Sequence, residues 1–416
     1  MKAALRVAIT ARSVFPLHGL GGLERSVYDL ARHLVREGAT VTVITRTPEA
    51  KADPDAIDPR VSLVFVPYRT FPLAGRRGTT IIDRSTAYPR FGARAGAMAA
   101  QLVSRGEADI VHGFGASVLG YARRRAQLAA PLVLNPQGLE EFGATDPSRA
   151  RLKRVAYLPL RRAVLRCAAA ADAVIATDRA LEPAVRQHLH VANERIVTIP
   201  NALDLESVDS AATAADAARV KNVAHVKPGE TILLSVGRIE RNKGFHVLAQ
   251  ALAGLREHSG RLAHDRWRWM LVGDGPFLSG LRAFVAQLGI SDHVVFAGRL
   301  PDRDLHAWYE AADLFVHPTL YEGSSLVTLE AMAHRRACVV TDAGGLRDKV
   351  HNGINGWIVP PGDAAALAAA ISGALEDAGR RREMGDAGRG IVERDFSWPA
   401  TARATMALYQ RLLQRT

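Results

Sequence analysis

Residues 231–245 read TILLSVGRIERNKGF, and this stretch contains the repeating pattern from which the fold can be predicted. A mostly apolar run (231–236) is followed by a loop between Gly237 and Gly244. A segment with helical spacing of apolar residues then begins at about Phe245. A short apolar run bounded by turn residues predicts a buried strand, and the helical spacing predicts a helix behind it. The stretch is therefore one strand–loop–helix unit.

The same unit recurs in both halves of the chain. The other strand-like runs, most of them followed by a helical stretch, are LRVAIT, ATVTVIT, VSLVFVP, ADIVHGF, PLVLNPQ, DAVIAT, RIVTIP, RWMLVGDGP, HVVFAG, DLFVHP, ACVVTDAGG and GWIVPP. Short β-branched runs that alternate with helices are typical of a parallel sheet covered by helices on both faces. A length of 416 residues gives room for two such domains.

We therefore predict an α/β protein with two Rossmann-like, doubly wound parallel-sheet domains. The break between them is expected near IPNALD, residues 199–204. The first domain then spans residues 1–200 and the second spans residues 201–390. Residues 391–416 are expected to form a C-terminal helix that packs back on the first domain.

The composition points to a protein of a reducing compartment. Cys167 and Cys338 are the two cysteines, and neither has a CxxC partner or a histidine at zinc-binding spacing. We expect both to be core residues. The first ten residues lack the apolar length and the cleavage site of a signal peptide, and no stretch reaches the roughly 18 apolar residues of a membrane span. The sequence therefore predicts a cytoplasmic protein.

The charge is uneven. Residues 1–200 hold 29 Lys and Arg against 17 Asp and Glu, so the first half carries the whole formal net charge of +12. Such asymmetry indicates an anionic partner: a membrane surface, a nucleic acid or a phosphorylated substrate. The basic segment lacks the interleaved aromatic residues on which bases stack, which argues against nucleic acid.

The segment 149–168 concentrates this charge on one side of a predicted helix. Its apolar face holds Leu152, Ala156, Leu160, Ala163, Val164 and Cys167, and its opposite face holds Arg151, Arg154, Arg161, Arg162 and Arg166. Pro159 is expected to kink the helix. Two interpretations remain open. The helix either lies on an anionic membrane, at the inner face of the plasma membrane, or packs its apolar face in the core with a solvated basic face.

In open parallel sheets, ligands bind at the carboxyl ends of the strands, so the loops there are the candidates for a site. The loop after residues 231–236 contains Arg238 and Lys243. Two cations suit a diphosphate, since arginine binds it with a forked pair of hydrogen bonds and lysine acts as a point charge. The alternative is that both are solvated loop cations.

Residues 321–330, YEGSSLVTLE, place two carboxylates around a predicted helix start. Ser324 or Ser325 is a suitable N-cap, so Glu322 lies in the loop and Glu330 lies one to two turns into the helix. The free amides of the first helical turn between them form an anion site. A nucleotide-sugar presents sugar hydroxyls, diphosphate and ribose hydroxyls in the same order. Alternatively, the first glutamate favours the helix dipole and the second is solvated.

Together, GRIERNKG, VGDGP, FAGRL, EGSSLVTLEAM, DAGG and GWIVPPGD resemble the second domain of retaining GT-B glycosyltransferases of family four. Their order and spacing match over about residues 199–363. In the first half, the Gly-rich loop, DIVHGF and IPNALD match less sharply. The resemblance implies two Rossmann-like domains facing each other across a cleft. It also implies a donor nucleotide-sugar held mainly by the second domain, an acceptor held mainly by the first, and retention of configuration without a metal.

The resemblance also implies roles for individual residues. Arg238 and Lys243 match the diphosphate-binding cations, Glu322 the glutamate at the hydroxyls of the transferred sugar, and Glu330 the one that holds the ribose. The other expected site residues are His112 near the reacting sugar, the donor-loop residues Gly237, Ser324, Ser325 and Leu326, and the closing loop at Gly21 and Gly22.

The chain also departs from the family pattern. Ser324-Ser325 stands where Phe-Gly is common, Gln137 stands where a histidine is common, and GGLRD (344–348) replaces GGxPE. These departures leave the sugar preference open.

We therefore predict a glycosyltransferase that uses a nucleotide-diphospho-sugar and a glycan, lipid-linked or small-molecule acceptor, without cofactor or metal. The Asp-x-Asp triplets at Asp53 and Asp55 and at Asp302 and Asp304 are not expected to bind a metal. Two alternatives remain: a nucleotide-sugar epimerase on the same scaffold, and an inactive membrane adaptor that binds sugar nucleotides.

Overall fold

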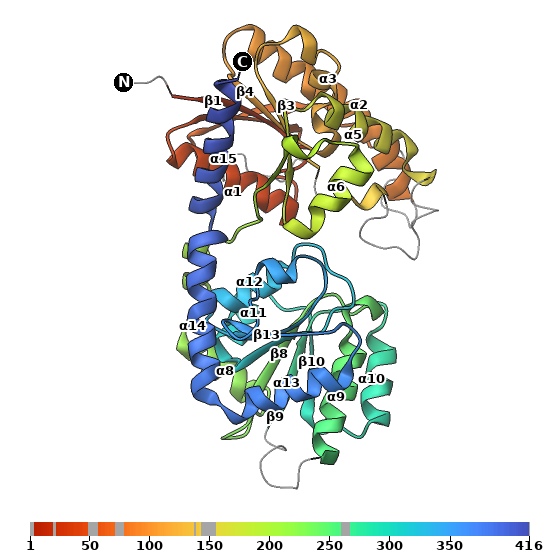
Figure 1. Ribbon diagram of the computed structural model, residues 1–416, viewed down its shortest axis with the longest axis vertical. Coiled ribbons are helices and arrows are strands. Elements are labelled where there is room, and N and C mark those ends of the chain that lie inside the picture. The colour runs from red at the N-terminus through yellow and green to blue at the C-terminus, as the bar shows by residue number, and fades with distance from the viewer. Residues whose placement is uncertain are drawn as a thin grey trace. The chain divides into compact units, whose positions relative to one another are not determined.

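The computed structural model describes residues 4–19, 22–48, 57–70, 79–136, 139–142, 155–258 and 267–415. The chain divides into two compact units. The first unit comprises Met1–Asn201 together with Trp398–Thr416, and the second comprises Ala202–Ser397. Residues 391–416, expected to form one helix, are thus divided between the two units after Ser397. Each unit is an α/β fold, with helices and strands following one another along the chain (Figure 1).

The first unit is built on a parallel sheet that, in the described residues, has seven strands in the order β3-β2-β1-β4-β5-β6-β7. The strands are β1 (Arg6–Thr10), β2 (Thr40–Arg46), β3 (Val61–Val66), β4 (Ile110–Phe114), β5 (Leu132–Asn135), β6 (Ala173–Ala176) and β7 (Ile196–Thr198). The direction of winding reverses between β1 and β4. The loops that follow these two strands therefore diverge, and this switch point is the usual ligand position in such sheets.

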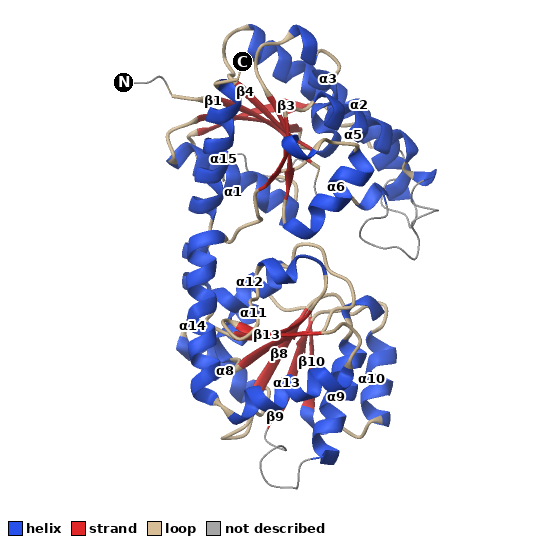
Figure 2. Ribbon diagram, in the orientation of Figure 1, coloured by secondary structure: helices blue, strands red, loops and turns tan. Residues whose placement is uncertain are grey.

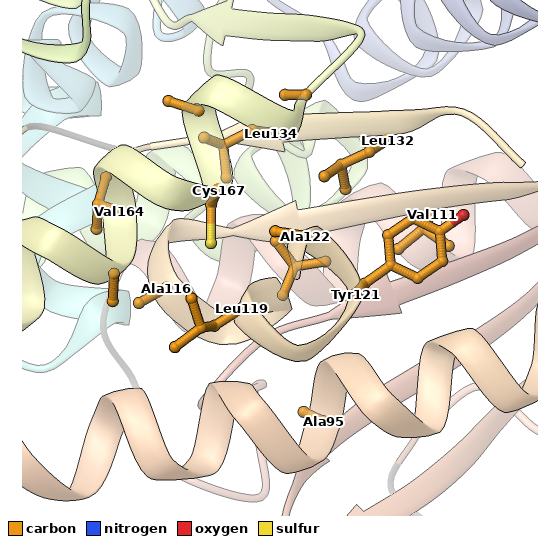
Figure 3. Packing of buried hydrophobic residues seen from close by; sticks show 14 of the residues in the cluster. Ala95, Val111, Ala116, Leu119, Tyr121, Ala122, Leu132, Leu134, Val164 and Cys167 are labelled. Atoms are coloured by element: carbon orange, nitrogen blue, oxygen red, sulfur yellow. The ribbon is translucent and has the colours of Figure 1, made fainter. Parts of the chain in front are cut away.

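Helices cover the sheet of the first unit (Figure 2). They include α1 (Gly22–Arg36), α2 (Thr79–Ser104), α3 (Leu119–Ala122), α5 (Leu158–Ala170), α6 (Glu182–Leu189) and α15 (Trp398–Leu413). Figure 3 shows the core beneath α2, α3 and α5, where Leu119 and Cys167 pack with Leu134 of β5. Cys167 is free and buried, as expected of a core residue.

Helix α5 bears on two expectations, the break at Pro159 and the location of the apolar face. Val155 and Ala156 are helical, the helix is interrupted at Tyr157, and α5 begins at Leu158, so the break expected from Pro159 falls two residues before the proline. The predicted apolar face is buried in the core, with Leu160, Ala163, Val164 and Cys167 all inside. The apolar face therefore packs against the protein. Arg151 and Arg154, expected at a membrane, lie outside the described residues.

The second unit is built on a parallel sheet whose described part has six strands in the order β10-β9-β8-β11-β12-β13. These are β8 (Thr231–Val236), β9 (Trp267–Val272), β10 (Val294–Gly298), β11 (Leu314–His317), β12 (Ala337–Thr341) and β13 (Gly356–Val359). Here the winding reverses between β8 and β11. The two doubly wound, parallel-sheet domains predicted from the sequence are thus confirmed.

Both faces of this second sheet are buried. Alternate residues of β8 face opposite ways, so Ile232 and Leu234 lie in one core cluster and Leu233 lies in the other. The covering helices are α7 (Leu205–Ala211), α8 (Ala214–Val223), α9 (Phe245–His258), α10 (Leu278–Gln287), α11 (Asp302–Ala311), α12 (Leu326–Ala333), α13 (Ala364–Glu376) and α14 (Ala378–Asp395). Among the helices in the described ranges, none combines the length and apolar character needed to cross a membrane.

Candidate functional site

At the switch point of the second unit, the loops after β8 and β11 pack backbone against backbone. Gly244 has φ +68°, and a Cβ at this position would lie 1.9 Å from the carbonyl oxygen of Pro318. The N–H of Leu320 donates to the carbonyl of Asn242 at 2.8 Å. Only glycine allows this left-handed conformation and this close approach together. Gly244 thus holds the two loops in contact.

A third loop joins them from the end of β12. Gly344 has φ +55°, and a Cβ there would lie 1.9 Å from the carbonyl oxygen of Glu322. The backbone of Glu322 is therefore braced by the 3-10 turn Gly344–Asp348, which follows β12. In that turn Arg347 forms an ion pair with Asp342, its Nη2 atom donating at 2.5 Å. The segment GGLRD differs from the family pattern, and its arginine, Arg347, thus pairs with the neighbouring Asp342.

Three donors converge on the carboxylate of Glu322. Lys243 Nζ lies 2.8 Å from Oε2, and His317 Nε2 lies 2.6 Å from the same oxygen. The N–H of Gly323 donates to Oε1 at 3.1 Å. Lys243 comes from the loop after β8 and Glu322 from the loop after β11, so the structure brings together two residues predicted from separate motifs.

These contacts keep Glu322 ionised. Burial alone would raise the pKa of its carboxyl, but the hydrogen bond and electrostatic interaction with His317, together with the positive charge of Lys243, outweigh burial and lower the pKa to about 2. The side chain is 11% exposed. Glu322 is thus a largely enclosed carboxylate that accepts hydrogen bonds throughout the neutral pH range.

Helix α12 begins next to this carboxylate. Its N-cap is Ser325, one of the two residues predicted for that role, and Leu326 is the first helical residue. The Ser325 hydroxyl contacts Thr328 Oγ1 at 2.9 Å and does not cap a backbone amide. Ser324 Oγ is buried and has no hydrogen-bond partner among the described residues. The start of α12 therefore places a hydroxyl group and the positive end of the helix dipole beside Glu322.

Glu330 lies on the same helix, further along. Its Oε2 accepts a hydrogen bond of 2.8 Å from the hydroxyl of Tyr309 on α11. Tyr309 is fully buried, and its burial together with the charge of Glu330 raises the pKa of its hydroxyl well above the usual value. The tyrosine therefore stays protonated and orients the carboxylate of Glu330.

Arg238 is not brought to this cluster. Its Nε lies 3.0 Å from Glu240 Oε1, and its side chain is 68% exposed. Gly237, which precedes it, lies at the end of β8 and donates its N–H to the carbonyl of Val272 at 3.0 Å. Exposed ion pairs contribute little to stability, so Arg238 can leave Glu240 at small cost when a ligand binds.

A cavity of about 330 Å³ opens at the switch point of the first unit. It lies where β1 and β4 end, with Arg12 from the first strand's loop and Gly115 from the second's. Tyr88 of α2 donates its hydroxyl to the carbonyl of Phe114 at 2.8 Å, and the Arg12 guanidinium lies 5.2 Å from the Tyr88 ring centroid. The cavity is also lined by Arg84, Glu141, Leu139, Leu160 and Val164. It thus combines cations, a carboxylate and an apolar wall.

His112, expected near the reacting sugar, is 1% exposed in the interior of the first unit. Its Nδ1 lies 2.6 Å from the hydroxyl of Tyr409 on α15, and its ring stacks on Phe114. Burial lowers the pKa of His112 to about 3, so the ring is neutral. This placement is that of a packed histidine, and the catalytic role of His112 stays a prediction.

The remaining predicted residues are placed as follows. Gly22 is the first residue of α1, and its carbonyl accepts a hydrogen bond of 2.7 Å from the Ser26 hydroxyl. Gly21 lies outside the described residues, as do Gln137, Asp53 and Asp55. Asp304 of the second Asp-x-Asp triplet pairs with Arg219. Within the described ranges, no group of three or more His, Cys, Asp or Glu side chains is arranged to hold a metal ion.

Two residues of the cluster were missed by sequence reasoning. His317 ends strand β11, and a polar residue at the carboxyl end of a parallel strand is a signal that could have identified it. Tyr309 lies in the last turn of α11, where nothing in the spacing separates it from an ordinary core residue.

Comparison with known proteins matches both halves of the chain. Residues 217–390 match the family described as Glycosyl transferases group 1, and residues 20–207 match the family described as Glycosyltransferase Family 4. A D-inositol 3-phosphate glycosyltransferase from Xylanimonas cellulosilytica is 30% identical over 421 residues. The match covers 95% of this chain and 93% of that relative.

Solved structures share the fold over nearly the whole chain. Sucrose-phosphate synthase from Thermosynechococcus elongatus superposes with a TM-score of 0.75 at 25% identity, covering 99% of this chain and 100% of that one. Anabaena HepE, solved in complex with UDP-glucose, superposes with a TM-score of 0.66 at 20% identity, covering 97% of this chain and 99% of that one. The second likeness, at this identity, shows a common fold.

Proposed function

Because this chain belongs to the group 1 glycosyltransferases, we propose that its second unit binds a nucleotide-diphospho-sugar and donates the sugar with retention of anomeric configuration. One observation carries the proposal. Lys243 and Glu322 meet at 2.8 Å at the switch point, and α12 begins directly behind them and leads to Glu330. A cation, a helix start and two flanking carboxylates match a diphosphate between two sets of hydroxyl groups.

The proposed reaction breaks the bond between the anomeric carbon and a phosphate oxygen and forms a bond from that carbon to an acceptor oxygen. The acceptor attacks from the face that the phosphate leaves, and its proton passes to the departing phosphate oxygen. Negative charge grows on the diphosphate during this step. Lys243 and the first amides of α12 are proposed to stabilise that charge, and Arg238 is proposed as a second cation that turns from Glu240.

The two glutamates are proposed to hold opposite ends of the donor. Glu322 is ionised and largely enclosed, which suits an acceptor for the hydroxyls of the transferred sugar. Glu330, oriented by Tyr309, is proposed to accept from the ribose hydroxyls. Loss of sugar contacts should lower turnover, whereas loss of ribose contacts should weaken every ligand that contains the nucleoside.

We propose that the reaction needs no metal ion, because Lys243, Arg238 and the helix start supply positive charge to the diphosphate. The test is donor turnover in a chelator-treated sample. Unchanged turnover with EDTA is expected. Turnover that disappears with EDTA and returns with Mg²⁺ or Mn²⁺ would contradict this part of the proposal.

The acceptor is proposed to bind in the cavity of the first unit. Two guanidinium groups, one carboxylate and an apolar wall suit a small polyol or sugar that carries an anionic group. The relative from Xylanimonas is named for a polyol phosphate, so inositol phosphates are the first acceptors to test. Arg84→Gln should raise the KM for such an acceptor and leave hydrolysis of the donor in water unchanged. An unchanged KM would move the acceptor site elsewhere.

Contact of the first unit with an anionic membrane is proposed to be electrostatic, at the cytoplasmic face, without insertion of α5. The apolar face of α5 packs in the core, while Arg162 is exposed. Vesicles with anionic lipid should then retain the protein at low salt and release it at 1 M salt, where the Debye length is about 3 Å. Equal retention at both salt concentrations, or none at low salt, would rule out this contact.

A panel of nucleotide-sugars, with UDP-sugars first, tests the function. A transferase should slowly hydrolyse one donor when no acceptor is present. An epimerase would convert the sugar and leave the diphosphate bond intact, and an adaptor would bind without turnover.

A further inference from the structure

The carboxylate of Glu322 is held by two side chains of different character. Lys243 belongs to the loop after β8, and its side chain is 20% exposed. His317 belongs to strand β11 itself and is 1% exposed. Both donate to the same oxygen, Oε2. One partner is therefore on a loop at the ligand site, and the other is fixed in the sheet.

The position of His317 is set by its surroundings. It pairs in register with Val340 of β12, and its ring stacks on Phe315 with 6.0 Å between centroids and an angle of 15°. A side chain held on a central strand between two others has little freedom to turn. The 2.6 Å contact to Glu322 is thus built into the sheet.

The hydrogen bonding also identifies the ring nitrogen that donates to Glu322. His317 Nδ1 is buried and finds no hydrogen-bond partner in the part of the chain that the structure describes. A carboxylate oxygen only accepts, so the atom that faces Glu322 must carry the proton. His317 therefore donates from Nε2 to Glu322.

In the proposed function, Lys243 binds the diphosphate of the donor in addition to pairing with Glu322. When a donor binds, its diphosphate competes with Glu322 for the lysine ammonium group. Once Lys243 turns to the diphosphate, the Oε2 atom of Glu322 retains, among the described side chains, the hydrogen bond from His317. Without it, the carboxylate would keep, among its described contacts, the 3.1 Å hydrogen bond from the Gly323 N–H to Oε1, and Oε2 would not be held when the sugar hydroxyls bind.

We propose that His317 is a positioning residue for Glu322. Its hydrogen bond keeps the Glu322 carboxylate directed at the transferred sugar while Lys243 leaves Glu322 and pairs with the diphosphate of the donor. This inference rests on the proposed function. His317 itself touches no substrate and acts through Glu322. A histidine that served only to pack β11 would have no such coupling to the sugar.

The test compares His317→Phe with His317→Gln. Phenylalanine keeps the stacking on Phe315 but donates no hydrogen bond, whereas the glutamine amide can donate to Glu322. Loss of a hydrogen bond to a charged group should lower kcat for donor hydrolysis by about 10- to 150-fold in the Phe variant. The affinity for the nucleoside diphosphate alone should stay nearly unchanged, and His317→Gln should recover most of the turnover.

A double-mutant cycle with Glu322→Ala separates positioning from packing. Calorimetry gives the Kd of the nucleotide-sugar relative to that of the nucleoside diphosphate, so the cycle needs no turnover. His317→Phe should change this ratio in the wild type and have no further effect once Glu322 is alanine. Equal effects in both backgrounds, or wild-type kcat in the Phe variant, would overturn the inference.

Thermal unfolding shows whether each variant is folded, and His317→Leu replaces the Phe variant in the cycle if the latter is not. Different results would contradict the proposed function and the positioning role of His317. If the wild-type protein neither binds nor turns over any nucleotide-sugar, the proposed function fails and the inference fails with it. If the wild type hydrolyses a donor and the cycle is additive, only the role of His317 is wrong.

Discussion

The ammonium group of Lys243 lies 2.8 Å from the carboxylate of Glu322, and this ion pair joins the loops on the two sides of the switch point in the second unit. The residues are 79 positions apart in the chain. Their meeting places a cation for a diphosphate and an acceptor for sugar hydroxyls side by side. Within this ion pair, each charge neutralises the other.

Removal of the cation should weaken binding of the diphosphate. Lys243→Ala deletes a charged hydrogen-bond donor, so calorimetry should show nucleoside diphosphate affinity lowered by about 10- to 150-fold. Lys227→Ala is a matched control, because Lys227 is an exposed lysine in the segment before β8, at the opposite end of the strand. Similar affinities in both variants would remove the phosphate assignment of Lys243.

The two glutamates should differ in which ligand they affect. Glu330→Gln should weaken both the nucleoside diphosphate and the nucleotide-sugar, because the ribose is present in each. Glu322→Gln should leave the nucleoside diphosphate nearly untouched and lower kcat for donor hydrolysis. Calorimetry and turnover on the same samples check this. Equal losses of affinity for both ligands in both variants would contradict the assignment of Glu322 to the sugar and Glu330 to the ribose.

The close packing of Gly344 against the backbone of Glu322 should be sensitive to one added methyl group. Gly344→Ala puts a Cβ 1.9 Å from the Glu322 carbonyl at a φ of +55°, so the loop must move. A displacement near 1 Å in a catalytic group costs on the order of 10²-fold in rate. Gly373→Ala on α13 is the control, since its Cβ would meet nothing within 4 Å. Wild-type kcat in the Gly344 variant would show that turnover does not depend on this packing of Gly344 against Glu322.

Stability should depend on pH through His112. Its pKa is lowered from 6.5 to about 3 by burial, so below pH 6.5 the unfolded chain binds a proton that the folded protein does not. The contribution is therefore fully present above about pH 6.5 and is lost as the pH falls toward 3, by about 1.4 kcal/mol per pH unit. Urea unfolding at pH 7, 6 and 5 should show a smaller decline for His112→Phe than for the wild type. Parallel declines would contradict the buried neutral ring.

Much of the fold could be predicted because it depends on local patterns. The run 231–236 and the residues from Phe245 onward form β8 and α9 as expected, and the alternation of such units specifies parallel sheets. Pro159 was expected to break the regular helix, and the helix is interrupted two residues earlier, at Tyr157. The local pattern predicted the break but not the residue at which it falls.

Residue type together with loop position identified Lys243 and Glu322, which the structure brings together. The binding roles of Lys243, Glu322 and Glu330 stay predictions. Arg238 satisfied the same rule, yet its side chain pairs with Glu240, because a local ion pair can be made without a ligand. His317 was missed since its function depends on a contact across the turn after β11, which spacing alone does not reveal. Tyr309 is placed by the packing of α11 on α12, a tertiary contact with no sequence signal.

Proton NMR of donor hydrolysis tests the central claim most directly. The wild-type protein and Lys243→Ala are incubated with α-linked nucleotide-sugars, and the anomeric signals are followed from the first minutes. We expect the wild type to release a nucleoside diphosphate and a sugar that is first the α-anomer, and the lysine variant to be far slower. A β-anomer as first product, an isomerised nucleotide-sugar, or binding without any turnover would contradict it.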